Sequence, residues 1–155
     1  NLVSVLNKNY ADKKPIFLCV LNGSFLFASE LIKRFNHECE VSFVKLSSYQ
    51  GLNSTGNIKN LIGINDNLEE RNIIIVEDIV DTGYTIYSVM EEIKNHKPKS
   101  VEVATLLFKP KSYKKKIPIN YSAINVGNEF LVCFFFVFYG IGRNLEDIFI
   151  IEENS

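Results

Sequence analysis

The sequence predicts an α/β fold in which a central, mostly parallel β-sheet is flanked by helices. Residues 16–21 and 73–76 are continuous apolar runs with many β-branched side chains, which indicates strands that are covered on both faces. Each run leads through a polar turn into a segment, 25–35 or 86–93, whose apolar residues recur at helical spacing. Strands that alternate with helices in this way are typical of parallel sheets.

The size and charge of the chain narrow the possible functions. Residues 1–155 are enough for one domain with a full hydrophobic core. The 17 basic and 18 acidic residues nearly balance, so no basic face indicates nucleic acid, and we expect no such partner.

We expect no association with a membrane. No signal peptide is visible, and the apolar run at 130–139 is far shorter than the roughly 20 residues of a membrane-spanning helix. Cys19, Cys39 and Cys133 are odd in number and widely spaced, with no Cys-x-x-Cys pair. This pattern favours free thiols in the reducing cytoplasm, where we expect the protein to act.

The other elements are expected in the following order. Residues 1–10 form the end of a helix, and Pro98 follows the helix after the central strand. Residues 47–57 are polar and rich in Ser and Gly, and they form either a lid or a solvated loop between two strands. The charged run at 111–116 is expected to be solvated surface. Further strands are predicted at 41–46, 101–108, 119–126, 130–139 and 147–151.

The strongest functional signal lies at residues 73–85. The buried strand is expected to end at the paired carboxylates of Glu77 and Asp78, and ligands of open α/β sheets bind outside the carboxyl ends of their strands. The turn Asp-Thr-Gly-Tyr-Thr at 81–85 offers backbone N–H groups and hydroxyls just before a helix, which suits a phosphate group. A solvated acidic turn is the alternative interpretation of the two carboxylates.

The stretch Val-Glu-Asp-Ile-Val-Asp-Thr-Gly-x-Thr at 76–85 closely resembles the phosphoribosyl-diphosphate (PRPP) binding motif of the type I phosphoribosyltransferases, in the form of the hypoxanthine-guanine branch. The resemblance runs from about residue 9 to residue 151. It implies the type I phosphoribosyltransferase fold with a small hood. The family carries a further segment before residue 1, so we expect that segment to be missing and the hood to be incomplete. A dinucleotide-binding domain is excluded, because no Gly-x-Gly-x-x-Gly follows any strand.

The reaction implied by the resemblance is a step of purine salvage. A pentosyltransferase of this kind moves the 5-phosphoribosyl group of PRPP to N9 of hypoxanthine or guanine with Mg²⁺, and releases IMP or GMP and pyrophosphate. In the family, Glu77 and Asp78 would accept from the ribose hydroxyls and approach Mg²⁺ through water, and Asp81 would be the general base or acid at N7 of the purine. The 5-phosphate would bind the backbone of Thr82, Gly83, Tyr84 and Thr85. The family also forms homodimers or homotetramers.

The same resemblance assigns the rest of the pocket. Asn22 and Gly23 would bind pyrophosphate, with a cis peptide between them, although an ordinary βα turn explains these residues equally well on their own. Lys109 would contact the 6-oxo group of the purine, where a solvated lysine is the simpler interpretation. Phe130 would stack on the base, the backbone of Leu131 would read its edge, Arg143 would reach the pyrophosphate, and the closing loop would contain Ser48 and Tyr49.

One window departs from the family pattern. Residues 133–138 read Cys-Phe-Phe-Phe-Val-Phe, where the family has two glycines and an Asp that completes a second metal site; that Asp is Val137 here. Residues 125–127 also differ. The chain is therefore an active enzyme with a rearranged second metal site, or a degenerate non-catalytic protein that binds PRPP or a nucleotide as a regulator, or a sequence altered by error in this window. The choice between hypoxanthine, guanine and xanthine cannot be read from it.

Overall fold

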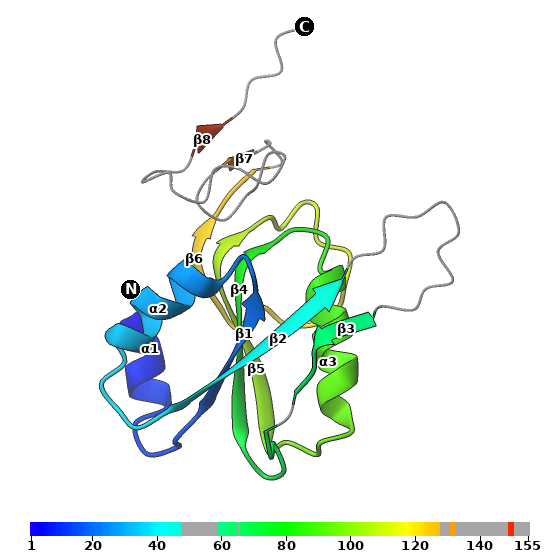
Figure 1. The fold of residues 1–155 in the computed structure, drawn as a ribbon. Helices are drawn as coiled ribbons and strands as arrows, with labels where there is room; N and C mark the ends of the chain where they lie inside the picture. The colour runs from blue at the N-terminus through cyan, green and yellow to red at the C-terminus, as the bar shows by residue number, and fades with distance from the viewer. Residues whose placement is uncertain (48–58, 65, 128–130, 133–148, 151–155) are drawn as a thin grey trace, which may run out of the picture.

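The computed structural model describes residues 1–47, 59–64, 66–127, 131–132 and 149–150. Its centre is a six-stranded sheet in the order β3-β2-β1-β4-β5-β6 (Figure 1). All neighbouring pairs are parallel except β2 and β3, which are antiparallel at one edge. The strands are β1 (Ile16–Leu21), β2 (Glu40–Ser47), β3 (Lys59–Ile62), β4 (Asn72–Val80), β5 (Ser100–Phe108) and β6 (Tyr121–Asn125). The predicted fold class is confirmed.

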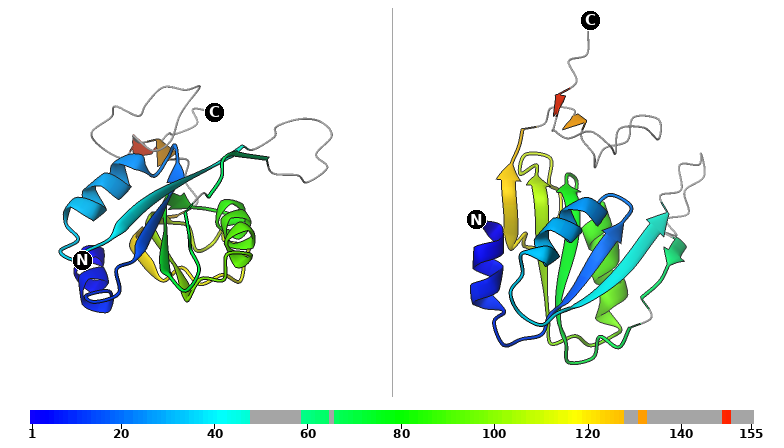
Figure 2. Two further views of the ribbon diagram at one scale, coloured as in Figure 1. Left: turned by 60° about the horizontal axis from the view of Figure 1, so that its bottom comes forward. Right: turned by 60° about the vertical axis from the view of Figure 1, so that its left-hand side comes forward.

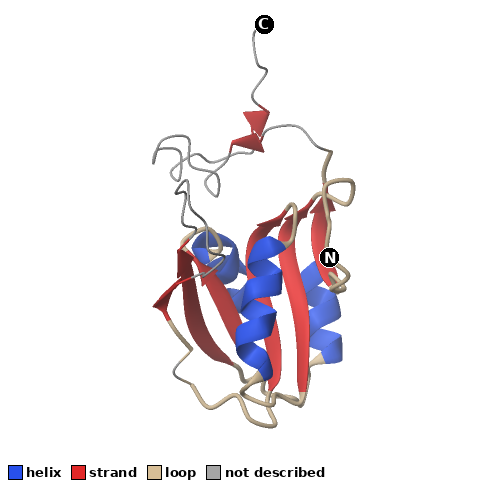
Figure 3. Cartoon of the chain, turned by 90° about the vertical axis from the view of Figure 1, so that its right-hand side faces the viewer, coloured by secondary structure: helices blue, strands red, loops and turns tan. Residues whose placement is uncertain are grey.

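In the described part of the chain, helices cover both faces of the sheet (Figures 2 and 3). Helices α1 (Leu2–Asn9) and α2 (Phe25–Lys33) lie on one face, and α3 (Tyr84–Lys94) lies on the other. The buried residues form two matching clusters, because side chains alternate along each strand: Ile73 and Ile75 pack toward α3, whereas Ile74 and Val76 pack toward α1 and α2. All four are completely buried, as the uninterrupted apolar run predicts.

Helix α1 corresponds to the helical end expected at residues 1–10. Asn1 caps it by accepting a hydrogen bond from the Val3 N–H. Beyond its last residue, the buried Tyr10 donates from its hydroxyl to Glu102 Oε2 at 2.6 Å, and the Tyr121 hydroxyl donates to the same oxygen at 2.6 Å. These bonds tie the chain after α1 to β5 and β6.

Strand β4 is longer than the sequence predicts, and the expectation that it ends at the acidic pair is wrong. Backbone pairing with β5 continues from Glu77 opposite Thr105 to Val80 opposite Phe108. Glu77 and Asp78 therefore project from within a paired strand, and both are buried. The strand β3 was not predicted at all; its four residues pair with the end of β2.

The other predicted strands match β2, β5 and β6 with shifts of a few residues at their ends. In the C-terminal region the structure describes β7 (Leu131–Val132) and β8 (Phe149–Ile150), which pair antiparallel. The rest of the two apolar segments predicted there, and most of the region that bears on a hood, lie outside the described residues.

Two further expectations can be compared with the structure. Cys19 and Cys39 are free, as predicted, and burial raises the pKa of the Cys19 thiol to about 12, so this thiol is unreactive. Cys133 lies outside the described residues. Among the helices that the structure describes, none is long and apolar enough to cross a membrane.

Candidate active site

Two buried carboxylates on β4 form the centre of the site. Glu77 and Asp78 are each only 6% exposed. Glu77 Oε1 accepts from the backbone N–H of Asp78 at 3.2 Å, and Asp78 Oδ1 accepts from the backbone N–H of Ile79 at 2.8 Å. Glu77 Oε2 is buried without a hydrogen-bond partner among the described residues. Burial, with the neighbouring Asp78 carboxylate, raises the pKa of Glu77 well above its usual value.

The loop after β1 lies directly against this acidic pair. A Cβ atom placed on Gly23 would be 2.3 Å from Asp78 Oδ2 and 2.6 Å from Asp78 Cγ, so only glycine fits there. The parallel pairing of β1 with β4, which sets Cys19 opposite Val76, brings the loop to this point. Sequence positions more than fifty residues apart thus share one edge of the sheet.

The predicted cis peptide is present in this loop, but it is one bond earlier than expected. It joins Leu21 to Asn22, not Asn22 to Gly23. The bond directly follows the last residue of β1. The glycine is needed for its close approach to Asp78 and not for the cis bond itself.

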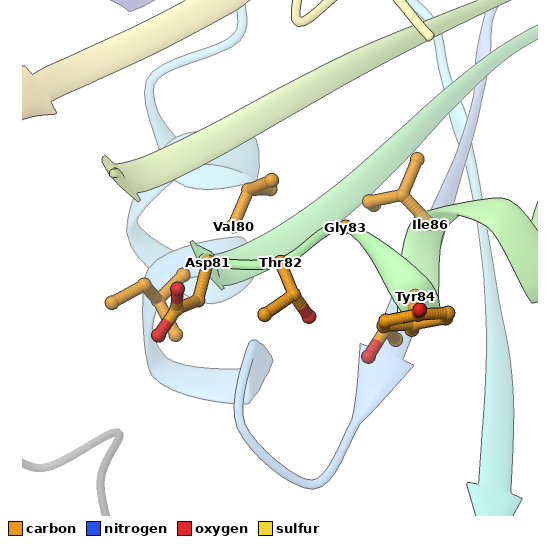
Figure 4. Close-up of a pocket in the computed structure, with 8 residues that line it drawn as sticks. Val80, Asp81, Thr82, Gly83, Tyr84 and Ile86 are labelled. Carbon is orange, nitrogen blue, oxygen red and sulfur yellow. The ribbon is translucent and has the colours of Figure 1, made fainter. Parts of the chain in front are cut away.

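The turn at 81–85 connects β4 with the start of α3 (Figure 4). Gly83 is the N-cap residue and has φ +83°, a left-handed conformation that favours glycine. Glycine has no side chain with which to cap the helix, and the first backbone N–H groups of an α-helix have no intrahelical acceptor. A pocket of about 170 Å³ lies at this turn and is lined by Ile79, Val80, Asp81, Thr82, Gly83, Tyr84, Thr85 and Ile86. Open N–H donors at a helix N-terminus suit a phosphate.

Lys109 joins the site from the end of β5. Its backbone N–H donates to the Val80 carbonyl at 2.9 Å, and its Nζ lies 3.5 Å from Asp81 Oδ2. The lysine side chain is 7% exposed, whereas that of Asp81 is 41% exposed. The solvated alternative for Lys109 is therefore wrong, since parallel pairing of β4 and β5 sets the two residues side by side.

The two carboxylates have the chemistry of magnesium ligands. Among the described residues, no three His, Cys, Asp or Glu side chains gather into a metal cluster. Mg²⁺ is commonly bound by one or two carboxylates, with waters and substrate oxygens as the other ligands. Glu77 Oε2, buried and unpartnered beside Asp78, is an acceptor that such a cation or a hydroxyl group would satisfy.

The structure leaves part of the predicted site undescribed and adds residues that were missed. Ser48, Tyr49, Phe130, Val137 and Arg143 lie outside the described residues. Of Leu131, the structure describes the backbone, which pairs with Ile150.

The expectation that residues 111–116 are solvated surface is wrong for Tyr113 and Lys115, which are half-buried. Tyr113 packs against Gly83, and Lys115 packs against Tyr84 and Tyr87. The sequence contained one signal of this packing, which is the aromatic residue Tyr113 within an otherwise basic run.

Comparison with known proteins is consistent with this geometry. Residues 1–132 match the model of the phosphoribosyl transferase domain. The hypoxanthine-guanine-xanthine phosphoribosyltransferase of Tritrichomonas foetus is 36% identical over 99% of this chain and 84% of that protein. The hypoxanthine-guanine phosphoribosyltransferase of Streptococcus pyogenes is 38% identical over 96% of this chain and 83% of that protein. The chain belongs to the hypoxanthine-guanine phosphoribosyltransferase family.

Solved structures of this family of pentosyltransferases share the fold. A hypoxanthine-guanine phosphoribosyltransferase from Bacillus anthracis, with HEPES in its active site, has a TM-score of 0.89 and 31% identity over 97% of this chain and 89% of that chain. A hypoxanthine phosphoribosyltransferase from Staphylococcus aureus has a TM-score of 0.90 and 33% identity over 97% of this chain and 83% of that chain.

Proposed function

We propose that the protein transfers the 5-phosphoribosyl group of PRPP to N9 of hypoxanthine or guanine with Mg²⁺, and releases IMP or GMP and pyrophosphate. The observation that carries the proposal is that residues from three neighbouring strands meet: Gly23 from the loop after β1, the buried carboxylates within β4, and Lys109 directly after β5. They meet beside a turn that suits a phosphate. The names of the relatives in the family support the choice of base.

The sugar-phosphate half of the substrate fits the β4 residues. Glu77 and Asp78 can only accept hydrogen bonds when ionised, and the ribose 2- and 3-hydroxyls can donate them. Glu77 Oε2 has no other partner among the described residues. The 5-phosphate fits the helix N-terminus at Tyr84, where an anion gains up to about 2 kcal/mol.

The purine fits the pair of Asp81 and Lys109. N7 and the 6-oxygen lie next to each other on one edge of a 6-oxopurine. Two side chains that lie 3.5 Å apart at their charged atoms can therefore contact both positions at once. The ammonium can donate to a 6-oxo group but cannot accept from a 6-amino group, so it selects the base. Asp81 holds or returns the proton at N7, a role that typically contributes about 10²–10⁴ in rate.

The transition state of such a transfer resembles an oxocarbenium ion. The protein therefore acts mainly by positioning the two substrates and by stabilising charge. Glu77 and Asp78 would hold Mg²⁺, largely through water. When bound, the ion would stabilise the negative charge that develops on the leaving pyrophosphate.

The direct test is conversion of radiolabelled hypoxanthine to IMP with PRPP and Mg²⁺. Asp81→Asn should lose most turnover but keep PRPP affinity, because the amide keeps the size of the carboxylate and loses its basicity. An equal loss of turnover and affinity would contradict the general-base role. Addition of EDTA should abolish turnover, and Mg²⁺ in excess should restore it.

A second candidate is a non-catalytic protein that binds PRPP or a nucleotide on the same fold to regulate a partner. It is favoured by Val137 in place of the usual Asp and by the bulky residues at 133–138. The paired Asp81 and Lys109 favour the enzyme, because a binding protein has no need of a base at N7. PRPP binding without IMP formation in the same assay would support the second candidate. We also propose a homodimer or homotetramer, which sedimentation analysis can test.

A further inference from the structure

The connection between β5 and β6, residues 109–120, lies against the turn at 81–85 and is hydrogen-bonded to it. The Lys109 N–H donates to the Val80 carbonyl at 2.9 Å, and the Lys114 N–H donates to the Thr82 carbonyl at 3.2 Å. These two backbone bonds hold the connection along the turn beyond the point where the β4–β5 pairing ends. The turn is therefore not a free loop, because a second segment lies against it.

Tyr113 is the side chain of the connection that lies closest to Gly83. A Cβ atom placed on Gly83 would be 2.3 Å from Tyr113 Cε2 and 2.9 Å from Cδ2, so the ring lies directly on the glycine backbone. The ring is itself held in place. It packs edge-on to Phe108, with ring centroids 5.4 Å apart, and its hydroxyl donates to the Ile117 carbonyl at 2.7 Å.

The ring therefore contacts the turn at the residue with the least common backbone conformation. Gly83 has φ +83°, and glycine has the largest conformational freedom of any residue. A ring packed on it limits the conformations that the turn can reach. The N–H groups of the turn are then already oriented before a ligand arrives, which lowers the cost of binding.

Lys115 brings a positive charge to the same place. Its Nζ lies 3.9 Å from the centroid of the Tyr84 ring and 4.5 Å from that of Tyr87. Both tyrosines belong to the first turn of α3, and Lys115 is half-buried, whereas Lys114 and Lys116 are exposed. The helix dipole repels a cation at the N-terminus of a helix. The two aromatic faces offset that repulsion, and a bound anion would reverse it.

We propose that Tyr113 is a positioning residue that holds the turn at 81–85 ready for a phosphate, and that Lys115 adds a cationic charge to the same anion site. The inference rests on the proposed function, because it concerns the binding of the 5-phosphate of PRPP. The segment that follows Lys109 thus has a role of its own: Lys109 is proposed to contact the purine, whereas Tyr113 and Lys115 act on the 5-phosphate of PRPP.

The probe for this role is ribose 5-phosphate, which carries the 5-phosphate without the pyrophosphate. Its Kd is measured by titration calorimetry, and the KM values for PRPP and hypoxanthine are measured on the same preparations. Tyr113→Ala should weaken ribose 5-phosphate binding about tenfold, the equivalent of one charge-assisted hydrogen bond, and raise the KM for PRPP in parallel. Tyr113→Phe keeps the ring and should stay within about threefold of the original protein.

The role of the Lys115 charge can be tested against a matched control, Lys116, in the same run of lysines. Lys115→Met should weaken ribose 5-phosphate binding about three- to tenfold, and the loss should shrink as salt concentration rises. Lys116→Met, one residue away and exposed, should leave the Kd unchanged. The KM for hypoxanthine should stay the same in all four variants, because only the phosphate end of the site is altered.

The outcomes separate this inference from the proposed function. If the original protein binds neither PRPP nor ribose 5-phosphate, both are overturned. If it binds them and the Tyr113→Ala and Lys115→Met variants bind equally well, only this inference is overturned. A lower kcat and a lower Tm with unchanged KM and Kd would show a purely structural role for Tyr113. If Tyr113→Ala does not fold, the comparison of Lys115→Met with Lys116→Met decides alone.

Discussion

A single methyl group added at Gly23 tests whether the loop after β1 and the acidic pair of β4 meet as described. In Gly23→Ala, the new Cβ would lie 2.3 Å from Asp78 Oδ2, 2.6 Å from Cγ and 2.8 Å from Oδ1. Gly23 does not have a positive φ, so the backbone itself accepts alanine. The substitution therefore tests space and not backbone conformation.

The size of the effect follows from these distances. To reach an ordinary contact of 3.4 Å, the loop and the Asp78 carboxylate must separate by about 1 Å. Asp78 is 6% exposed, so it cannot move into solvent without breaking the packing around it. Overpacking of this kind costs about 1–3 kcal/mol, or a Tm lower by roughly 2–12 °C in a chain of this length. A displacement of about 1 Å at a substrate-binding group can cost about 10² in kcat/KM.

Gly63→Ala is the matched control. The nearest atom to a Cβ on Gly63 is Glu92 Oε1 at 3.9 Å, an ordinary van der Waals contact. Its free energy of unfolding should change by no more than about 0.5 kcal/mol. Both variants are compared with the original protein by thermal unfolding and by steady-state kinetics with PRPP. If Gly23→Ala matches Gly63→Ala in Tm and in kcat/KM, the close contact of Gly23 with Asp78 is refuted.

Three other predictions follow from the buried polar groups. Burial raises the pKa of Glu77 above its unfolded value, so its contribution to stability is present at low pH and is lost as the pH rises through the folded pKa. The Tm of Glu77→Gln should therefore increase relative to that of the original protein as the pH rises above the usual range of a glutamate, and a pH-independent difference would contradict the shift. Lys109→Ala should raise the KM for hypoxanthine far more than that for PRPP, because its Nζ lies beside Asp81, and a uniform effect in steady-state kinetics would argue against contact with the 6-oxo group. Tyr10→Phe should lower the free energy of unfolding, measured in urea, by about 1–3 kcal/mol, because it removes one of the two hydroxyl donors to the Glu102 carboxylate. The KM values for hypoxanthine and PRPP should not change, because Glu102 lies near the start of β5, away from the site. Unchanged stability would show that Tyr121 alone satisfies that carboxylate.

Much of the fold could be predicted from short-range patterns. The run at 73–76 is apolar at every position, which only a strand covered on both faces requires, and the two core clusters fill those faces. The spacing of Ile86, Val89 and Ile93 marks the buried side of α3. These features depend on residues within one or two turns of each other, so the sequence alone is sufficient.

The sequence named the residues of the candidate site but could not give their arrangement in space. The acidic pair, the turn and Lys109 were proposed because the segments that contain them match motifs of the family. The end of β4 was placed wrongly, because backbone pairing with β5 up to Val80 carries the strand past two carboxylates that by composition look like a turn. Strand β3 was missed for the same kind of reason, since its four residues are ordered by pairing with β2.

The sequence by itself determined that the chain is an α/β protein of this family, with three acids and a turn that suits a phosphate in one stretch. Only the tertiary structure decided which distant residues surround them. Gly23 lies against Asp78, Lys109 lies beside Asp81, and Tyr113 lies on Gly83. The physical reason is that parallel strands bring their carboxyl ends to one edge of the sheet, whatever their separation along the chain. Tyr113 is a single tyrosine in a basic run, and it contacts the turn at 81–85 only because the segment after β5 packs there.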